Sequence, residues 1–227
     1  MRYLYETHMH TSESSKCATS TAIEQVRAYK KMGYAGIIVT DHFINGYTNC
    51  PPSLSWEQKM RHCVKGYEAA KLEGDKCDLD VFLGFEYCTA KGHEFLTYGL
   101  DLEFLIKHKD IDKMELEDYC TLVRKNGGYT AWAHPYRNRP WSPKDRPKVP
   151  FCLDGVEVFN SSESDANNKM AEVFAKKNKL VRQAGSDSHN AGYRISFAGI
   201  QLENRAKSIF DIIDALKTEK ATLFFPL

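Results

Sequence analysis

Hydrophobic positions along the chain follow two patterns, continuous apolar runs and a helical spacing. Their succession predicts strands followed by helices. Continuous apolar runs at residues 35–40 and 81–87 are typical of buried strands. Between residues 19 and 32 the side chains of Ile23, Val26 and Tyr29 fall on one helical face, and Gly33 ends that helix. Further strands are predicted at residues 3–8, 94–100, 129–134, 155–160, 180–189 and 197–202, and further helices at 55–72, 115–125, 164–177 and 207–218.

This succession of strands and helices is not interrupted by a linker, a repeat or a low-complexity tract. We therefore expect one domain over residues 1–227, a length that suits a single large α/β domain. Apolar strands joined by helices indicate a parallel sheet covered by helices, either as a barrel or as a doubly wound sheet. Residues 138–150 contain four prolines and are predicted to form a surface loop.

Charge is balanced along the chain, which limits the classes of partner. Lysine and arginine total 31, and aspartate and glutamate total 30, without a long run of either sign. A concentrated basic face for bulk nucleic acid or an anionic membrane is therefore not expected. No stretch has the roughly 18 apolar residues of a membrane-spanning helix, and the amino terminus lacks the apolar core of a secretion signal. We expect a cytoplasmic protein.

The cysteines give no sign of a structural role. There are seven, an odd number, and none forms a Cys-x-x-Cys pair, which argues against a disulfide framework or a zinc knuckle. We expect reduced thiols. Any metal ion would then have to be bound by histidine, aspartate and glutamate.

Six of the eight histidines lie at or beside the ends of predicted strands, where sites are assembled in parallel α/β folds. His8 and His10 are two residues apart, and so are Asp187 and His189. Side chains with this spacing in an extended backbone project from the same face, so each pair can bind one cation. The other polar groups near strand ends are Asp41, His42, Glu86, His93 and His134.

Each of these side chains has a plain structural explanation when it is taken alone. Glu86 would be a solvated carboxylate, and His134 a core histidine bonded to a carbonyl. Together they would crowd charge into one cavity, which is costly unless cations or protons offset it. Imidazole and carboxylate ligands without thiolate suit zinc, manganese or iron. A carboxylate such as Glu86 can bridge two ions through its two oxygens, so we predict a multinuclear site.

The ordered motifs HMH, TDH, GFE, GHE, AHP and SDSH, between Thr7 and His189, resemble those of the PHP (polymerase and histidinol phosphatase) superfamily. The resemblance implies a distorted β/α barrel of seven strands, TIM-barrel-like and related to the amidohydrolase fold. It also implies a trinuclear metal centre at the carboxyl-terminal mouth of that barrel, so we expect two to three divalent metal ions as cofactors.

The resemblance further implies which residues bind each ion. The first ion would be bound by His8, His10, Glu86 and Asp187. The second would be bound by Glu86, as a bridge, together with His93 and His134, and the third by His42 and His189. Many relatives complete the third site with an aspartate or histidine five residues after the His-x-His motif, where this chain has Ser15. Glu13 is the nearest carboxylate and could substitute.

Such a cluster favours phosphoester hydrolysis, because divalent ions activate water and clamp the oxygens of a phosphate. We expect a metal-dependent phosphoesterase that attacks a small phosphomonoester, such as histidinol phosphate or a nucleotide, with a metal-activated hydroxide. Asp41 either protonates the leaving group or orients a ligand histidine. Arg137 and Arg194 are candidate phosphate-binding residues, with Arg139 as a third, and the alternative for each is a solvated surface side chain.

Three alternative functions stay open. Loop aromatic residues could stack on bases, which would suit a phosphodiesterase or exonuclease acting on nucleotides or oligonucleotides, but packing explains such residues equally well; they are Tyr47, Trp56, Tyr136 and Trp141. A non-catalytic, metal-stabilised PHP module is the second alternative. Hydrolysis of a C–N bond is the third, although in amidohydrolase barrels it usually involves a metal-bridging lysine, which no strand end supplies here.

Overall fold

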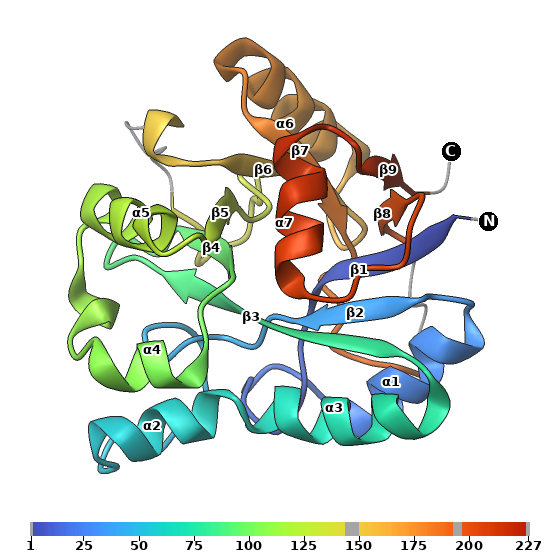
Figure 1. Ribbon diagram of the computed structural model, residues 1–227. Coiled ribbons are helices and arrows are strands. Elements are labelled where there is room, and N and C mark those ends of the chain that lie inside the picture. Colours follow the sequence, from blue (N-terminus) through green and yellow to red (C-terminus); the bar gives the residue numbers. More distant parts are fainter. Residues whose placement is uncertain (1, 144–149, 193–196, 226–227) are drawn as a thin grey trace.

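The computed structural model describes residues 2–143, 150–192 and 197–225, and in these residues a single mixed sheet curls into a barrel (Figure 1). Its nine strands are hydrogen-bonded in the order β7-β6-β5-β4-β3-β2-β1-β8-β9. Helices pack on the outside of the sheet (Figure 1). The expected α/β barrel is therefore confirmed, and the doubly wound sheet is excluded.

Seven strands form the wall of the barrel. They are β1 (Tyr3–Met9), β2 (Gly36–Val39), β3 (Asp80–Cys88), β4 (Glu94–Tyr98), β5 (Tyr129–Trp132), β6 (Gly155–Asn160) and β7 (Val181–Gly185). All neighbouring pairs among them are parallel except the two that include β4. The carboxyl ends of six strands therefore meet at one mouth of the barrel, where β4 contributes its amino end.

The barrel closes where β1 meets the segment that follows β7. Met9 and Ser188 form a parallel bridge there. Beside this bridge the Asp187 N–H donates to the carbonyl of His8 (2.8 Å), and the His10 N–H donates to the carbonyl of Ser188 (2.8 Å). The backbone of the His8–His10 motif is thus hydrogen-bonded to that of the Asp187–His189 motif. We call this contact the closure seam.

Two more strands extend the sheet beyond β1. β8 (Gly199–Leu202) pairs antiparallel with residues 3–5 of β1, and β9 (Thr222–Phe224) pairs antiparallel with β8. The prediction of a parallel sheet is therefore wrong for β8, and β9 is a strand that the sequence did not predict. β4 is antiparallel because residues 89–93, which join it to β3, are too few for a parallel crossover.

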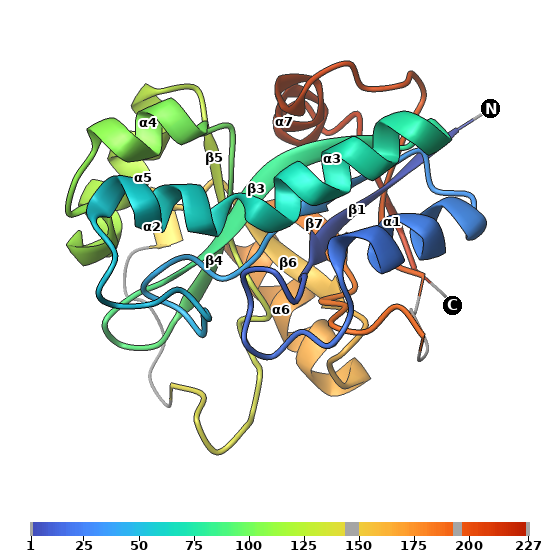
Figure 2. The same ribbon diagram turned by 90° about the horizontal axis from the view of Figure 1, so that it is seen from below.

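Helices α1 (Ala22–Lys31), α2 (Trp56–Cys63) and α3 (Lys65–Cys77) lie along one side of the barrel (Figure 2). α1 begins with a capping box, in which the Thr21 side chain accepts from the Glu24 N–H and the Glu24 carboxylate accepts from the Thr21 N–H. The apolar faces of α1 and α3 share one core cluster with β1 and β2. The mouth is thereby built on strands whose outer faces are buried.

The remaining helices cover other parts of the wall (Figure 1). They are α4 (Leu102–Lys107), α5 (Leu116–Lys125), α6 (Asp165–Asn178) and α7 (Ile209–Lys217), with 3-10 turns at Ile111–Lys113 and Pro150–Cys152. α4 was not predicted, because six residues are too few for a clear helical period. No helix among the described residues is long and apolar enough to cross a membrane.

The single helix predicted over residues 55–72 is in fact two helices that meet at Val64. This residue has φ −94° and ψ 0°, outside the helical range. Two residues further on, a Cβ on Gly66 would lie 2.1 Å from Thr11 Oγ1 and 2.3 Å from Asp41 Oδ2. Glycine therefore lets α3 start in close contact with the loop after β1. Hydrophobic periodicity does not reveal such a break, because both helices bury apolar residues.

Candidate metal centre

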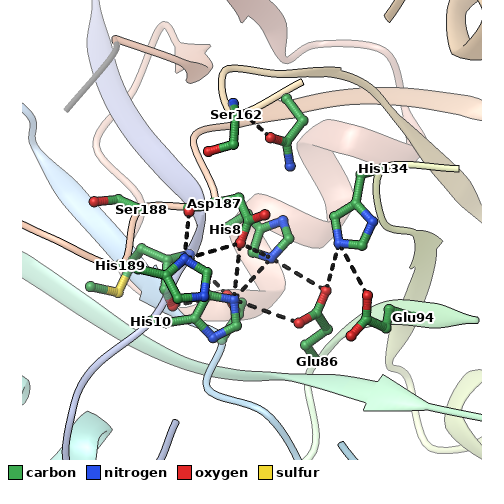
Figure 3. Close-up of polar contacts among 12 residues, drawn as sticks. His8, His10, Glu86, Glu94, His134, Ser162, Asp187, Ser188 and His189 are labelled. Carbon is green, nitrogen blue, oxygen red and sulfur yellow. Dashed lines mark hydrogen bonds and ion pairs between the residues drawn. The ribbon is translucent and has the colours of Figure 1, made fainter. Parts of the chain in front are cut away.

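Polar side chains from several strands converge at the mouth of the barrel (Figure 3). Among the described residues their ligand atoms form four overlapping groups of three, and the atoms of each group lie within 4.8 Å of one another. The groups are His8–His10–Asp187, His8–Glu86–His134, His10–His42–His189 and His42–Glu86–Glu94. All predicted ligands except Glu13 and His93 are therefore brought together.

Glu86, on β3, occupies the centre of this cluster and is 1% exposed. Its Oε1 lies 2.9 Å from His134 Nε2 and 3.5 Å from His8 Nε2. Its Oε2 lies 2.9 Å from His42 Nδ1 and 3.6 Å from His10 Nε2. Each carboxylate oxygen thus faces a different pair of imidazoles, which is the arrangement required of a carboxylate that bridges two ions.

Asp187 joins the two ends of the chain at the cluster. Its Oδ1 lies 3.3 Å from His8 Nε2 and 3.2 Å from His10 Nε2. The backbone at Asp187 has φ 56°, and that at His134 has φ 30°, in the left-handed region that side-chain-bearing residues rarely adopt. Such strain is concentrated at functional sites. β7 ends at Gly185, and irregular backbone rather than the strand predicted to residue 189 directs Asp187 into the mouth.

Glu157, on β6, positions His8 and was not predicted. Its Oε1 accepts a hydrogen bond from His8 Nδ1 (2.9 Å). Its Oε2 accepts from the His134 N–H (2.9 Å) and from Asn160 Nδ2 (2.9 Å). Because Nδ1 is engaged by Glu157, Nε2, which faces Glu86, is the nitrogen of His8 that can bind an ion once its own proton is displaced. The signal that could have indicated this role is a glutamate inside the apolar run at residues 155–160.

Ser15 and Asp41 position His10. The Ser15 hydroxyl donates to Asp41 Oδ1 (2.6 Å) and accepts from His10 Nδ1 (3.1 Å), and the Thr11 N–H also donates to Asp41 Oδ1 (2.7 Å). Asp41 is 3% exposed and is absent from the lining of the cavity described below. Of the two roles predicted for Asp41, this geometry favours the orientation of a ligand histidine over protonation of a leaving group.

At the start of β4, Glu94 rather than His93 faces the cluster. Glu94 Oε2 lies 3.6 Å from His134 Nε2. The His93 ring instead lies edge-on to Trp132, with ring centroids 5.8 Å apart. Neighbouring residues of an extended chain point to opposite sides of a sheet, so only one of the two can face the mouth. This corrects the predicted ligand set by one residue.

Glu13 caps helix α1 and does not join the cluster. Both of its carboxylate oxygens lie 3.0 Å from the Ala22 N–H, which donates to them. A negative charge is favourable at this position because the amino end of a helix carries partial positive charge. Glu13 belongs to none of the ligand groups. The prediction that it replaces the ligand missing at Ser15 is therefore corrected.

Cys17 lies beside the cluster, a position that nothing in the sequence indicates. Its Sγ is 3.0 Å from His189 Nε2. Burial raises the pKa of the Cys17 thiol, but hydrogen bonds with His189 and His42 lower it to about 7. The His189 ring stacks on that of His10, with centroids 4.3 Å apart. A cysteine without a partner at metal-ligand spacing carries no signal in a single sequence.

The buried imidazoles and carboxylates shift the pKa values of one another. Burial lowers the pKa of His8, but the carboxylates of Glu157, Asp187 and Glu86 raise it to about 10. Burial also lowers the pKa of His42, which Glu86 raises well above its ordinary value. Burial raises the pKa of Glu86, but the imidazoles hold it well below the usual range. Divalent ions can replace these compensating protons, so the donor set fits metal binding.

A cavity of about 600 Å³ opens over the cluster and is lined in part by Arg137 and Arg139. Arg137 Nε donates to Glu163 (2.7 Å), and its guanidinium also forms an ion pair with Asp187. The Arg139 side chain is 46% exposed. Arg194 lies outside the described residues. Two of the three arginines proposed for phosphate are thus placed at the mouth.

The loop aromatic residues divide into two groups. Tyr47 and Trp141 are 55% and 78% exposed and line the cavity. Trp56 and Tyr136 pack against the core, and Trp56 Nε1 donates to the carbonyl of Leu105 (2.9 Å). Packing therefore explains the second pair, whereas Tyr47 and Trp141 are available to a ligand.

No family model and no curated protein matches the sequence. Solved structures do match it. A two-domain protein from Bacteroides vulgatus, described as containing a predicted PHP-like metal-dependent phosphoesterase, is 18% identical with a TM-score of 0.72; the match covers 99% of this chain and 65% of that one. This chain therefore spans about two thirds of the length of that protein.

The descriptions of two further similar structures name other activities. Endonuclease Q, solved with a 27-mer duplex that carries an abasic lesion, is 13% identical with a TM-score of 0.66, and the match covers 96% of this chain and 57% of that one. An amidohydrolase from Chromobacterium violaceum is 15% identical with a TM-score of 0.60, and the match covers 98% of both chains. At such identities the similarity shows the fold, and this chain has the PHP-type barrel that its motifs implied.

Proposed function

We propose that this protein is a metal-dependent phosphoesterase that hydrolyses a small phosphomonoester, with a nucleotide or histidinol phosphate as the leading candidates. The observation that supports the proposal most strongly is the convergence of buried imidazoles and carboxylates beneath a cavity with arginines at its rim. We propose two to three divalent ions of zinc, manganese or iron as cofactors. When bound, such ions activate a water molecule and neutralise charge on a phosphoryl group.

The proposed ligand sets follow the groups of neighbouring atoms. His8, His10, Glu86 and Asp187 bind the first ion. Glu86, His134 and Glu94 bind the second, and His42 and His189 bind the third. Glu157 and Ser15 hold the rings of His8 and His10 so that Nε2 of each faces Glu86. These ligands are therefore oriented before any ion binds.

The arginines at the rim supply the contacts to phosphate. A guanidinium group binds two phosphate oxygens at once, which fixes the orientation of the ester. Arg139 is the freer of the two described arginines, since Arg137 is already bonded to Glu163 and Asp187. Arg137 therefore holds Asp187 in place. It can contact a phosphate only while its guanidinium stays bonded to Glu163 and Asp187.

The size of the cavity supports a small substrate. A volume of about 600 Å³ lies within the range of roughly 300–1,000 Å³ that is typical of small-molecule sites. The balanced net charge of +1 gives no broad basic surface for bulk nucleic acid. A cytoplasmic location and a single-domain organisation stay predictions of the sequence.

A phosphodiesterase acting on nucleotides is the second candidate. The specific observation in its favour is the pair of exposed aromatic side chains, Tyr47 and Trp141, beside the same cavity. Stacking of a base on an aromatic ring contributes about 1–3 kcal/mol and tolerates any base. Such a platform would hold either a mononucleotide or the end of an oligonucleotide.

The test compares kcat/KM for p-nitrophenyl phosphate, bis(p-nitrophenyl) phosphate and nucleoside monophosphates with added Mn²⁺ or Zn²⁺. We expect monoesters to be the better substrates.

Arg139→Ala should raise KM for monoesters roughly 10-fold, the value of one charge-assisted hydrogen bond, without loss of bound metal. Arg61→Ala, which removes an exposed arginine of α2 that pairs with Glu57, is the control. Faster turnover of the diester would favour the second candidate, and turnover of amides alone would contradict both.

A further inference from the structure

The proposed third ion lacks an anionic ligand of its own. Its group of neighbouring atoms contains only imidazoles, from His10, His42 and His189. Glu86 lies 2.9 Å from His42 but is shared with the other ions, so an anionic ligand of the third ion's own would offset more of that ion's charge in this largely buried place. Neither position considered for this role supplies a carboxylate, because Glu13 caps α1 and Ser15 stands where many relatives have an aspartate or histidine.

The Cys17 side chain lies beside this group, although its sulfur belongs to none of the groups whose ligand atoms lie within 4.8 Å of one another. Its Sγ is 3.0 Å from His189 Nε2, and it lines the same cavity as His42 and His189. Around a tetrahedral zinc ion, typical Zn–S and Zn–N bond lengths separate the sulfur and nitrogen ligand atoms by about 3.5 Å. The two side chains thus need to separate by only a few tenths of an ångström to share an ion.

The backbone around Cys17 is held in place on both sides. Before it, the Lys16 N–H donates to the carbonyl of Tyr47 (3.0 Å). After it, the Thr19 N–H donates to the carbonyl of His189 itself (2.9 Å). The loop that carries Cys17 is therefore attached to the residue whose imidazole the sulfur contacts. The backbone on both sides thus holds the Cys17 sulfur beside the His189 imidazole.

We propose that Cys17 is a thiolate ligand of the ion bound by His42 and His189. This inference rests on the metal centre of the proposed function and changes one part of it, since the sequence alone led us to expect only histidine and carboxylate ligands. A thiolate supplies the missing negative charge. It is also a soft ligand, so the third site should prefer zinc or iron to manganese or magnesium.

Cobalt substitution tests the proposal without an activity assay. Metal-free protein is titrated with Co²⁺ under a non-thiol reductant, and the near-ultraviolet absorption is followed for the charge-transfer band of a cobalt–thiolate bond. We expect this band in the wild type and its loss in Cys17→Ser. Cys77→Ser, which removes a half-buried thiol at the end of α3, is the control and should keep the band.

A second variant separates the loss of a ligand from damage to the loop. Cys17→Asp replaces the thiolate with a carboxylate, so it should bind as many equivalents of Co²⁺ as the wild type but show no thiolate band. A band that persists in Cys17→Ser, or wild-type protein that binds Co²⁺ without any such band, would overturn the proposal and leave the phosphoesterase intact. Wild-type protein that binds no Co²⁺ would overturn both.

Discussion

At the level of single residues, the cluster depends on side chains that touch no substrate. Glu157 accepts the Nδ1 proton of His8, and with its other oxygen it holds the backbone N–H of His134. One carboxylate thereby fixes two of the proposed ligands. Partners of this kind orient the imidazole and increase its basicity.

Glu157→Gln should lower the affinity for metal about 10–100-fold. The amide has one acceptor oxygen, whereas Glu157 accepts from His8 on one oxygen and from His134 and Asn160 on the other. A competition titration against a chromophoric chelator measures the change. Glu172→Gln, which alters a carboxylate on α6 paired with Arg182, serves as control. Unchanged affinity in the Glu157 variant would show that His8 does not need this partner.

Residue type explains which members of the site could be predicted. Histidines and acids at strand ends are conspicuous, so His8, His10, Glu86, Asp187 and others were recognised. Glu94 was missed because the choice between it and His93 depends on which residue faces the mouth, and this follows from the exact start of β4. Cys17 was missed because its contact with His189 joins positions 172 residues apart.

At the level of elements, the closure seam is held by a buried acid next to the proposed metal ligands. Glu6, on β1, is fully buried, and its Oε1 accepts from the N–H groups of Thr7, His8 and Ser186 (2.8–2.9 Å). Its Oε2 accepts from the Tyr29 hydroxyl on α1 (3.0 Å). One side chain thus connects β1, α1 and the segment after β7, so the geometry of both motif pairs depends on it.

The Glu6 carboxyl should make the stability of the metal-free protein depend on pH. Burial raises its pKa from 4.5 to about 7, against the hydrogen bonds that lower it. The folded state therefore holds a proton that the unfolded state has released, so this contribution is complete below pH 4.5 and is lost as the pH rises through 7. Its full size is about 3 kcal/mol.

Glu6→Gln, which cannot ionise, removes this dependence. Denaturant unfolding of metal-free protein across pH 4.5 to 7 should show a shallower decline of stability in the variant than in the wild type. Glu68→Gln, on the exposed face of α3, should keep the wild-type slope. Parallel curves for wild type and Glu6→Gln would contradict the assignment.

Local pattern predicted most elements but not how they begin, end or pair. Strands β2 and β3 could be predicted because each lies in a continuous apolar run. The break at Val64 depends on the approach of Gly66 to Asp41, a contact between distant parts of the chain. The antiparallel pairing of β8 likewise depends on the folded barrel, because β8 pairs with the edge of β1 at residues 3–5.

At the level of the whole molecule, the barrel brings opposite ends of the chain to one buried charge cluster. In the metal-free protein, burial lowers the pKa values of His8 and His189, but neighbouring carboxylates and Cys17 raise them to about 10 and about 9. Both imidazoles therefore carry protons at neutral pH. A metal ion must displace these protons before it can bind.

Metal binding should consequently release protons at pH 7. The number released should fall as the pH rises through 9 and 10, because the metal-free histidines then lose their protons beforehand. Calorimetric titration in buffers with different ionisation enthalpies measures this number directly. Binding without proton release at neutral pH would contradict the assignment of these histidines as ligands.

The central claim is that the mouth of the barrel binds catalytic divalent ions, and elemental analysis of the purified protein tests it most directly. The same sample is assayed for p-nitrophenyl phosphate hydrolysis before and after chelation. The account predicts two to three equivalents of metal, loss of turnover with the chelator and recovery with Zn²⁺ or Mn²⁺. His8→Ala and Asp187→Ala should lose both metal and turnover while remaining folded. Protein that hydrolyses the ester without bound metal, or that binds no metal at all, would contradict the account.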